Sequence, residues 1–121
     1  MSKKILAVDD SKTMRDMISY TLKNAGFEVF EAENGTHALE VLGKNYVDAV
    51  ITDLNMPEMN GIELIKSLRA NDSFRYTPIL MLTTESGEDM KQQGKMAGAT
   101  GWIVKPFNPE KLLQVVNKIC A

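Results

Sequence analysis

Residues that build disulfides and zinc sites are nearly absent from this chain. It has a single cysteine, Cys120, so no disulfide can form within it. It also has a single histidine, His37, with no second histidine or cysteine close by in the sequence. Zinc sites in proteins are built from several nitrogen and sulfur ligands. We therefore expect neither a disulfide framework nor a zinc centre.

An excess of charge of either sign is missing as well. The chain has 14 lysines and arginines against 16 aspartates and glutamates, a formal net charge of −2, and no long basic run. We expect no nucleic acid or membrane partner, because proteins that bind these polyanions through bulk charge are basic. The apolar runs are too short to cross a bilayer, and residues 1–4 lead into a strand-like run without a signal-peptide core. A cytoplasmic location is the expectation.

The sequence does contain a regular alternation of short apolar runs and helix-periodic segments. The expected strands are residues 5–8, 27–31, 49–53, 79–82 and 102–104, and the expected helices are 13–25, 35–44, 61–70, 85–97 and 109–119. The second strand mixes apolar and acidic residues, which suits a sheet edge, whereas the others are almost purely apolar. This order predicts an α/β doubly wound parallel sheet of five strands and five helices. A length of 121 residues suits one domain, 1–121.

Polar residues follow four of the apolar runs at the point where each run ends. Asp9 and Asp10 follow the first run, Asp53 ends the third, Thr83 follows the fourth and Lys105 follows the last. If these strands are parallel neighbours, the five side chains converge in one cleft, because open α/β sheets bind ligands beyond the carboxyl ends of their strands.

Each acidic residue taken alone has an ordinary structural explanation. Asp10 or Ser11 could cap the helix that follows, and Asp53 could be a simple loop residue. Their convergence favours a site, because two carboxylates about 4 Å apart repel by roughly 4 kcal/mol at an effective dielectric constant near 20. A hard cation relieves that repulsion, and oxygen-only ligands favour Mg²⁺ over zinc. A carboxylate held there can attack a phosphoryl group and form an aspartyl phosphate.

Together these motifs resemble the response-regulator receiver domains of two-component signalling. The resemblance covers the whole chain in four ordered motifs: Asp9-Asp10, Asp53 within Asp-Leu-Asn-Met-Pro-Glu-Met-Asn-Gly, Thr83, and Lys105-Pro106-Phe107. Among receivers the chain looks most like the single-domain chemotaxis regulators, because Ser-Lys-Thr-Met-Arg follows the acidic pair and Asn-Met-Pro comes shortly after Asp53, and we expect no output domain. The resemblance implies the flavodoxin-like strand order 2-1-3-4-5 and a cis peptide bond between Lys105 and Pro106.

The resemblance also implies how the acidic residues act. Asp53 is expected to be the phosphoacceptor, taking its phosphoryl group from a histidine kinase. Mg²⁺ is expected to be held by Asp10, by Asp53 and by the backbone carbonyl of Asn55, with Asp9 contributing through a water molecule.

Further residues are implied to bind, switch or tune. Thr83 and Lys105 are expected to bind the phosphoryl oxygens, and the side chains of Asn55 and Glu85 to influence the rate of dephosphorylation. Trp102 stands where receivers of this type usually have tyrosine or phenylalanine, a ring that swings inward as the threonine moves toward phosphate. Indole is larger, so two interpretations stay open: Trp102 swings inward on activation, or it is a fixed anchor on its strand.

The partner surface of the family is formed by the fourth helix, the last strand and the fifth helix. The fourth helix is poorly specified here, because Gly87 and Gly94 each disfavour helix by about 1 kcal/mol relative to alanine. A weakly held helix can move. The expected partner is a flagellar motor switch protein or another effector, with a phosphatase as a further partner and a monomer as the oligomeric state.

Other functions use the same residues. A phosphate sink or a phosphorelay intermediate needs an identical site. An enzyme of another class, a Mg²⁺-dependent phosphohydrolase with an aspartyl-phosphate intermediate, commonly has a second acid two residues after the nucleophile, where this chain has Asn55. A flavodoxin-like carrier is disfavoured because an acidic cleft repels a flavin phosphate. We expect chiefly a switch that catalyses its own phosphorylation and autodephosphorylation.

Overall fold

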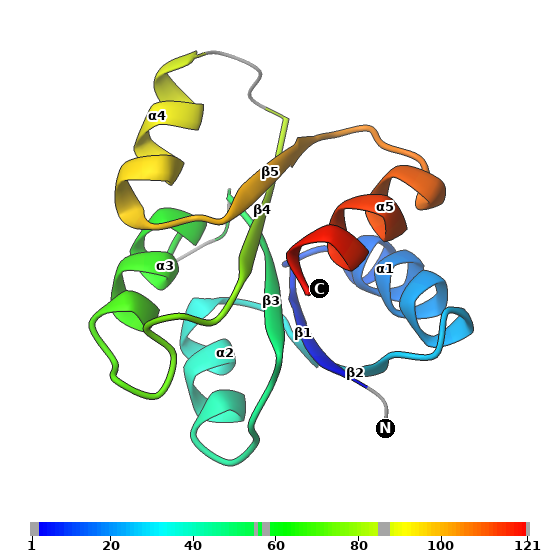
Figure 1. The fold of residues 1–121 in the computed structure, drawn as a ribbon, viewed down its shortest axis with the longest axis horizontal. Helices are drawn as coiled ribbons and strands as arrows, with labels where there is room; N and C mark the ends of the chain where they lie inside the picture. The colour runs from blue at the N-terminus through cyan, green and yellow to red at the C-terminus, as the bar shows by residue number, and fades with distance from the viewer. Residues whose placement is uncertain (1–2, 55, 57–58, 85–87, 121) are drawn as a thin grey trace.

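The computed structural model describes residues 3–54, 56, 59–84 and 88–120. These residues form one parallel sheet in the order β2-β1-β3-β4-β5, with helices between the strands (Figure 1). The strands are β1 (Lys4–Val8), β2 (Glu28–Ala32), β3 (Ala49–Asp53), β4 (Ile79–Thr83) and β5 (Gly101–Val104). The helices are α1 (Lys12–Asn24), α2 (Gly35–Leu42), α3 (Gly61–Arg69), α4 (Glu88–Ala97) and α5 (Pro109–Ile119). The expected architecture and strand order are confirmed, including the edge position of β2.

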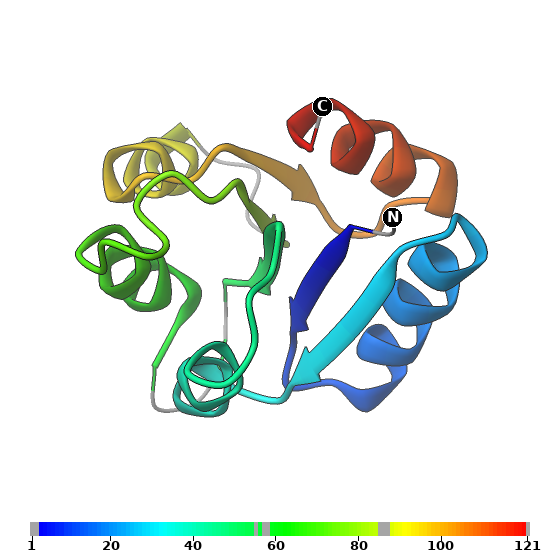
Figure 2. The same ribbon diagram turned by 60° about the horizontal axis from the view of Figure 1, so that its bottom comes forward.

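The helices cover both faces of the sheet. Figures 1 and 2 show α1 and α5 on one face and α2, α3 and α4 on the other. Alternate residues of β4 serve the two layers: Leu80 and Leu82 pack with the cluster of α1 and α5, and Ile79 and Met81 pack with the cluster of α2, α3 and α4. The strand is apolar at successive positions because neither of its faces meets water.

Side-chain caps mark where the helices begin. Ser11 caps α1 by accepting a hydrogen bond from the backbone N–H of Met14, so Asp10 is not used as the cap. Asn60 and Glu63 form a reciprocal capping box at the start of α3. Asn108 caps α5, as its sequence predicted. The described part of α4 begins at Glu88, whereas position 85 was expected to start this helix; residues 85–87 lie outside the described chain.

Gly94 in α4 has a packing role that the sequence pattern did not reveal. A Cβ atom at this position would lie 2.6 Å from Cε of Met81, a buried side chain of β4. The glycine therefore lets α4 approach the sheet closely. Just beyond the C-terminal end of the same helix, Arg69 of α3 donates hydrogen bonds to the carbonyl oxygens of Gly98 (2.9 Å) and Thr77 (2.7 Å). The C-terminal end of α4 is thus attached to the loop that follows α3.

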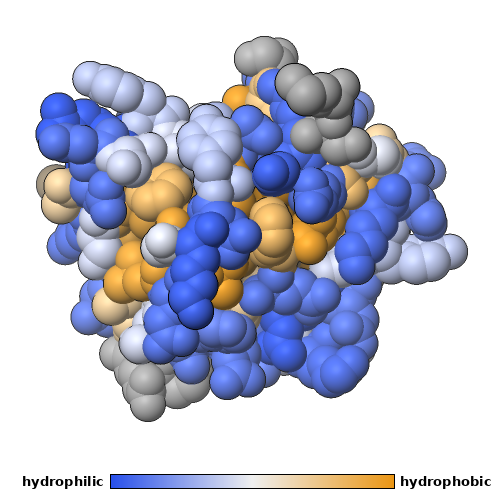
Figure 3. Space-filling model, turned by 90° about the horizontal axis from the view of Figure 1, so that it is seen from below, coloured by the Kyte–Doolittle hydropathy of each residue, from blue (hydrophilic) through white to orange (hydrophobic). Residues whose placement is uncertain are grey.

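Figure 3 views the molecule from below, toward the loops that precede β3 and β4. Hydrophobic side chains show in the middle of this face, and hydrophilic ones surround them. The acidic residues of the candidate site lie at the opposite end of the sheet. None of the helices formed by the described residues combines the length and apolar content that a membrane span requires.

Candidate functional site

The site lies where four neighbouring strands end. The order of the sheet makes β1, β3, β4 and β5 consecutive neighbours. Asp9 directly follows β1, Asp53 ends β3, Thr83 ends β4 and Lys105 directly follows β5. The register pairs Asp53 with Leu82 and Thr83 with Val104, so these strand ends lie at nearly the same level. The structure therefore gathers the predicted residues at one edge.

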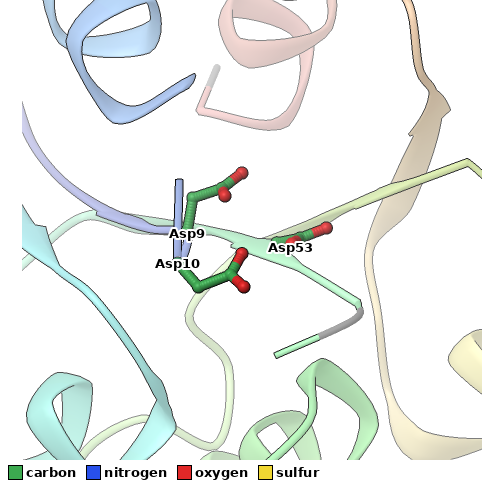
Figure 4. Close-up of side chains that lie close together, drawn as sticks. All are labelled: Asp9, Asp10 and Asp53. Carbon is green, nitrogen blue, oxygen red and sulfur yellow. The ribbon is translucent and has the colours of Figure 1, made fainter. Parts of the chain in front are cut away.

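Three carboxylates form the centre of the site. One oxygen each from Asp9, Asp10 and Asp53 lies within 4.8 Å of the others, and Figure 4 shows the three side chains close together. Asp9 is 1% exposed and Asp53 6% exposed, whereas Asp10 is open to solvent. The donor set consists only of carboxylate oxygens, which suits a hard cation such as Mg²⁺. The arrangement is compatible with Mg²⁺ binding.

Lys105 bridges two of these carboxylates. Its Nζ donates hydrogen bonds to Oδ1 of Asp53 (3.0 Å) and to Oδ2 of Asp9 (3.2 Å). Its backbone N–H donates to the carbonyl oxygen of buried Thr83 at 2.7 Å. The following peptide bond, to Pro106, is cis, as the resemblance implied. Lys105 therefore connects residues at the ends of β1, β3 and β4.

Burial governs the electrostatics of the site. Burial raises the pKa of Asp53, and the charges of Asp9 and Asp10 act in the same direction; the hydrogen bond and charge of Lys105 lower it but leave the pKa above its ordinary value. For Lys105, burial acts to lower the pKa, but its bonds to Asp53 and Asp9 and their charges outweigh burial and raise it. Lys105 is thus protonated at neutral pH. Its single positive charge only partly compensates the negative charge of the three carboxylates.

Arg15 is a contact of the site that sequence reasoning missed. Its Nη1 donates a hydrogen bond to the backbone carbonyl oxygen of Asp9 at 2.7 Å. In the sequence, a cation on an amphipathic helix is indistinguishable from an ordinary surface residue. Only the packing of α1 beside the end of β1 brings this guanidinium to the acidic pair.

Gly61 is required by its closeness to the backbone of Asp53. A Cβ atom at Gly61 would lie 2.5 Å from the carbonyl oxygen of Asp53, and backbone atoms cannot give way as a side-chain tip can. We expect Gly61→Ala to lower the free energy of unfolding by about 1 to 3 kcal/mol, the usual cost of overpacking. Urea denaturation measures it. Gly43→Ala is the matched control, since its Cβ would lie 3.4 Å from the nearest atom; equal stability of the two variants would contradict the close approach.

Trp102 lies on β5 and faces the layer of α2, α3 and α4. The ring is partly buried against that cluster, and Nζ of Lys91 on α4 lies 5.8 Å from the ring centroid. A shallow hollow of about 550 Å³ beside it is lined by residues of β5, of the loop that follows it, among them Phe107, and of α5, where Lys111 lies. Inward movement of the Trp102 ring on activation stays a prediction. The two residues expected to tune dephosphorylation, Asn55 and Glu85, lie outside the described chain.

Comparison with known proteins gives a consistent result. A model of the response regulator receiver domain family matches residues 5–117. The chain is 49% identical to chemotaxis protein CheY1 of Helicobacter pylori over 96% of this chain and 95% of that protein. It is 41% identical to chemotaxis protein CheY of Pseudomonas aeruginosa, over 96% and 94% of the two chains.

A solved structure of a chemotaxis response regulator has the same fold. The chemotaxis response regulator CheY4 of Vibrio cholerae superposes with a TM-score of 0.95 at 50% identity, covering 98% of this chain and 99% of that one. Both the family match and this superposition span the strand ends that carry the acidic cluster and Lys105. The chain therefore belongs to the response regulator receiver domain family, among receivers of the CheY chemotaxis type.

Proposed function

We propose that this chain is a response regulator whose Asp53 accepts a phosphoryl group from a histidine kinase in a Mg²⁺-dependent reaction. The observation that carries the proposal is the cluster of Asp9, Asp10 and Asp53 with Lys105 bonded to two of its members. A purely structural role accounts poorly for gathering three mutually repelling carboxylates around one cation. A phosphoryl-transfer site needs this combination of acidic and basic groups.

The carboxylates of Asp9, Asp10 and Asp53 fit a magnesium site, while Asn55 lies outside the described residues. Asp10, Asp53 and the backbone carbonyl of Asn55 would hold the ion, with Asp9 acting through water. Three carboxylates, one divalent cation and Lys105 sum to zero formal charge. When bound, Mg²⁺ would supply positive charge that lowers the repulsion between the Asp53 carboxylate and the incoming phosphoryl oxygens.

The chemistry assigned to the chain's own residues is nucleophilic substitution at phosphorus. A carboxylate oxygen of Asp53 attacks the phosphorus atom of a phosphohistidine whose other ring nitrogen carries a proton; the O–P bond forms, the P–N bond breaks, and the histidine leaves as neutral imidazole. Lys105 exchanges its bond to Asp53 for a bond to a phosphoryl oxygen, since its raised pKa keeps it protonated. The hydroxyl of Thr83, at the end of the adjacent strand, binds a second phosphoryl oxygen. Asn55 and Glu85 influence how fast water removes the group.

The output follows from the charge that phosphorylation adds. A phosphoryl group brings roughly one further negative charge and new acceptor oxygens, which recruit Lys105 and Thr83. Because Lys105 is joined to β5, its movement changes the face formed by α4, β5 and α5, where Trp102 and the shallow hollow lie. We propose that this face binds a flagellar motor switch protein or another effector in the cytoplasm. The protein would act as a monomer, with a phosphatase as a further partner.

Emission from Trp102, the only tryptophan, tests the proposal. We expect Mg²⁺ to change the emission, and beryllofluoride, which mimics a phosphoryl group on a carboxylate, to change it further. Asp53→Asn is the control, in which beryllofluoride should have no effect because it has no carboxylate to bind. Emission of the wild-type protein that responds to neither Mg²⁺ nor beryllofluoride would overturn the proposal.

A further inference from the structure

Arg15 on α1 links the ends of two strands beside the acidic cluster. Its Nη1 donates to the backbone carbonyl oxygen of Asp9 at 2.7 Å, and its Nε lies 3.5 Å from Oε1 of Glu31 on β2. The Arg15 side chain is only 15% exposed. A hydrogen bond from a charged donor to a carbonyl, removed from most solvent, is stronger than a neutral one at the surface. Arg15 therefore holds the Asp9 carbonyl firmly.

Asp9 and Asp10 are held in different ways. The Asp9 carboxylate accepts hydrogen bonds from the backbone N–H of Ser11 (2.9 Å) and from Lys105 (3.2 Å), and the Asp9 N–H donates to Ala32 (3.1 Å). No residue in the described ranges donates a hydrogen bond to the carboxylate of Asp10, which is exposed. The position of that carboxylate depends on the backbone that carries it.

The Asp9 carbonyl belongs to the peptide plane that joins Asp9 to Asp10. Peptide units are planar, so fixing this oxygen restricts the plane and the direction in which the Asp10 side chain leaves the backbone. We propose that Arg15 is a positioning residue for the Mg²⁺ site, which presents the Asp10 carboxylate to the ion by holding this peptide. The inference rests on the proposed function, because it concerns the same acidic cluster.

A positioning role and a simple charge effect predict opposite results. The positive charge of Arg15 alone repels a dication, so its removal would strengthen the binding of Mg²⁺ and Ca²⁺ alike. Loss of positioning instead weakens Mg²⁺ most, since Mg²⁺ demands near-ideal octahedral geometry while Ca²⁺ accepts flexible coordination. The ratio of the two affinities therefore separates the two effects.

The experiment titrates Mg²⁺ and Ca²⁺ into wild-type protein, Arg15→Met and Arg15→Lys, following Trp102 emission. Loss of groups that orient metal ligands typically weakens metal binding by 10- to 100-fold, and we expect Arg15→Met to bind Mg²⁺ about 10-fold more weakly, with a smaller loss for Ca²⁺. Arg15→Lys, which keeps a charged donor, should recover part of the Mg²⁺ affinity. Lys12→Met removes the same charge from an exposed position on α1 and should not weaken Mg²⁺ binding.

Urea denaturation without metal checks that each variant folds. If Arg15→Met does not fold, the Mg²⁺ to Ca²⁺ affinity ratio of Arg15→Lys decides, and a ratio equal to that of the wild type would overturn the inference. Unchanged or stronger Mg²⁺ binding by folded Arg15→Met would overturn it while leaving the proposed function intact. Wild-type protein that binds no Mg²⁺ would overturn the proposed metal site and this inference together.

Discussion

Asp53→Asn will take up no phosphoryl group from acetyl phosphate in the presence of Mg²⁺, whereas the wild-type protein will. The substitution keeps the shape of the side chain but replaces the carboxylate, which is the nucleophile, by an amide. The loss of phosphorylation should be complete, because the carboxylates of Asp9 and Asp10 follow β1, a different strand from the one that Asp53 ends. Intact-protein mass spectrometry measures the added phosphoryl mass directly.

Asp72→Asn is the matched control for this loss. Asp72 is an exposed aspartate in the loop before β4, at the other end of the sheet, so its removal should leave phosphorylation unchanged. Phosphoryl mass retained on Asp53→Asn would contradict the assignment of the nucleophile. Loss of phosphorylation in both variants would show that the effect does not belong to Asp53.

The stability of Asp53→Asn also follows from the raised pKa of Asp53. A raised pKa in the folded protein means that the fold disfavours the ionised carboxylate. Without metal, the variant should therefore be more stable than the wild type at neutral pH, on the order of 1 kcal/mol. This advantage should shrink as the pH falls through the folded pKa and vanish below the unfolded value of about 3.9, where Asp53 is neutral in both states. Urea denaturation at several pH values tests the sign.

Lys105→Met will lower the free energy of unfolding of the metal-free protein by about 3 kcal/mol, since removing one partner of a buried ion pair leaves uncompensated charge. The side chain is 14% exposed and bonded to two carboxylates that are almost fully buried. The pKa of Lys105 is raised, so its contribution is fully present below the unfolded pKa of about 10.4 and is lost only as the pH rises through the folded value. Denaturation at neutral pH measures the effect in full.

Mg²⁺ should stabilise Lys105→Met more than it stabilises the wild type, because the ion then replaces a missing positive charge rather than adding to one. Lys118→Met removes an exposed lysine of α5 and should change neither the stability nor the response to Mg²⁺ by more than about 0.5 kcal/mol. If Lys105→Met matched the wild type in both measurements, the lysine would have no role in balancing the acidic cluster.

The fold could be predicted because the two helical layers, one on each face of the sheet, determine which strand positions are apolar. β4 is apolar at successive positions since its two faces meet different helical layers, and β2 is mixed because it lies at the edge. Side-chain caps at Asn60 and Asn108 signal where helices begin. The α4 segment was harder to predict, because glycine disfavours helix and the sequence does not show why Gly94 is there. The reason is the close approach of Met81 on β4, which only the three-dimensional structure reveals.

The convergence of the acidic residues and Lys105 at one end of the sheet could be predicted, whereas the contacts that support them could not. Asp53, Thr83 and Lys105 stand at strand ends, and parallel strands bring such ends together. The contact between Arg15 and the Asp9 carbonyl depends on how α1 packs beside β1, and nothing in the local sequence encodes it. The requirement for glycine at position 61 likewise comes from the approach of α3 to the end of β3.

Borohydride reduction locates the phosphoryl group most directly, since it converts an aspartyl phosphate into homoserine at the modified position. The protein is incubated with acetyl phosphate and Mg²⁺, reduced, digested and sequenced by mass spectrometry. We expect homoserine at position 53 and at no other aspartate, with none formed when Mg²⁺ is removed by a chelator. Homoserine at Asp9, Asp10 or elsewhere in place of position 53, or full modification of Asp53 without Mg²⁺, would contradict the account.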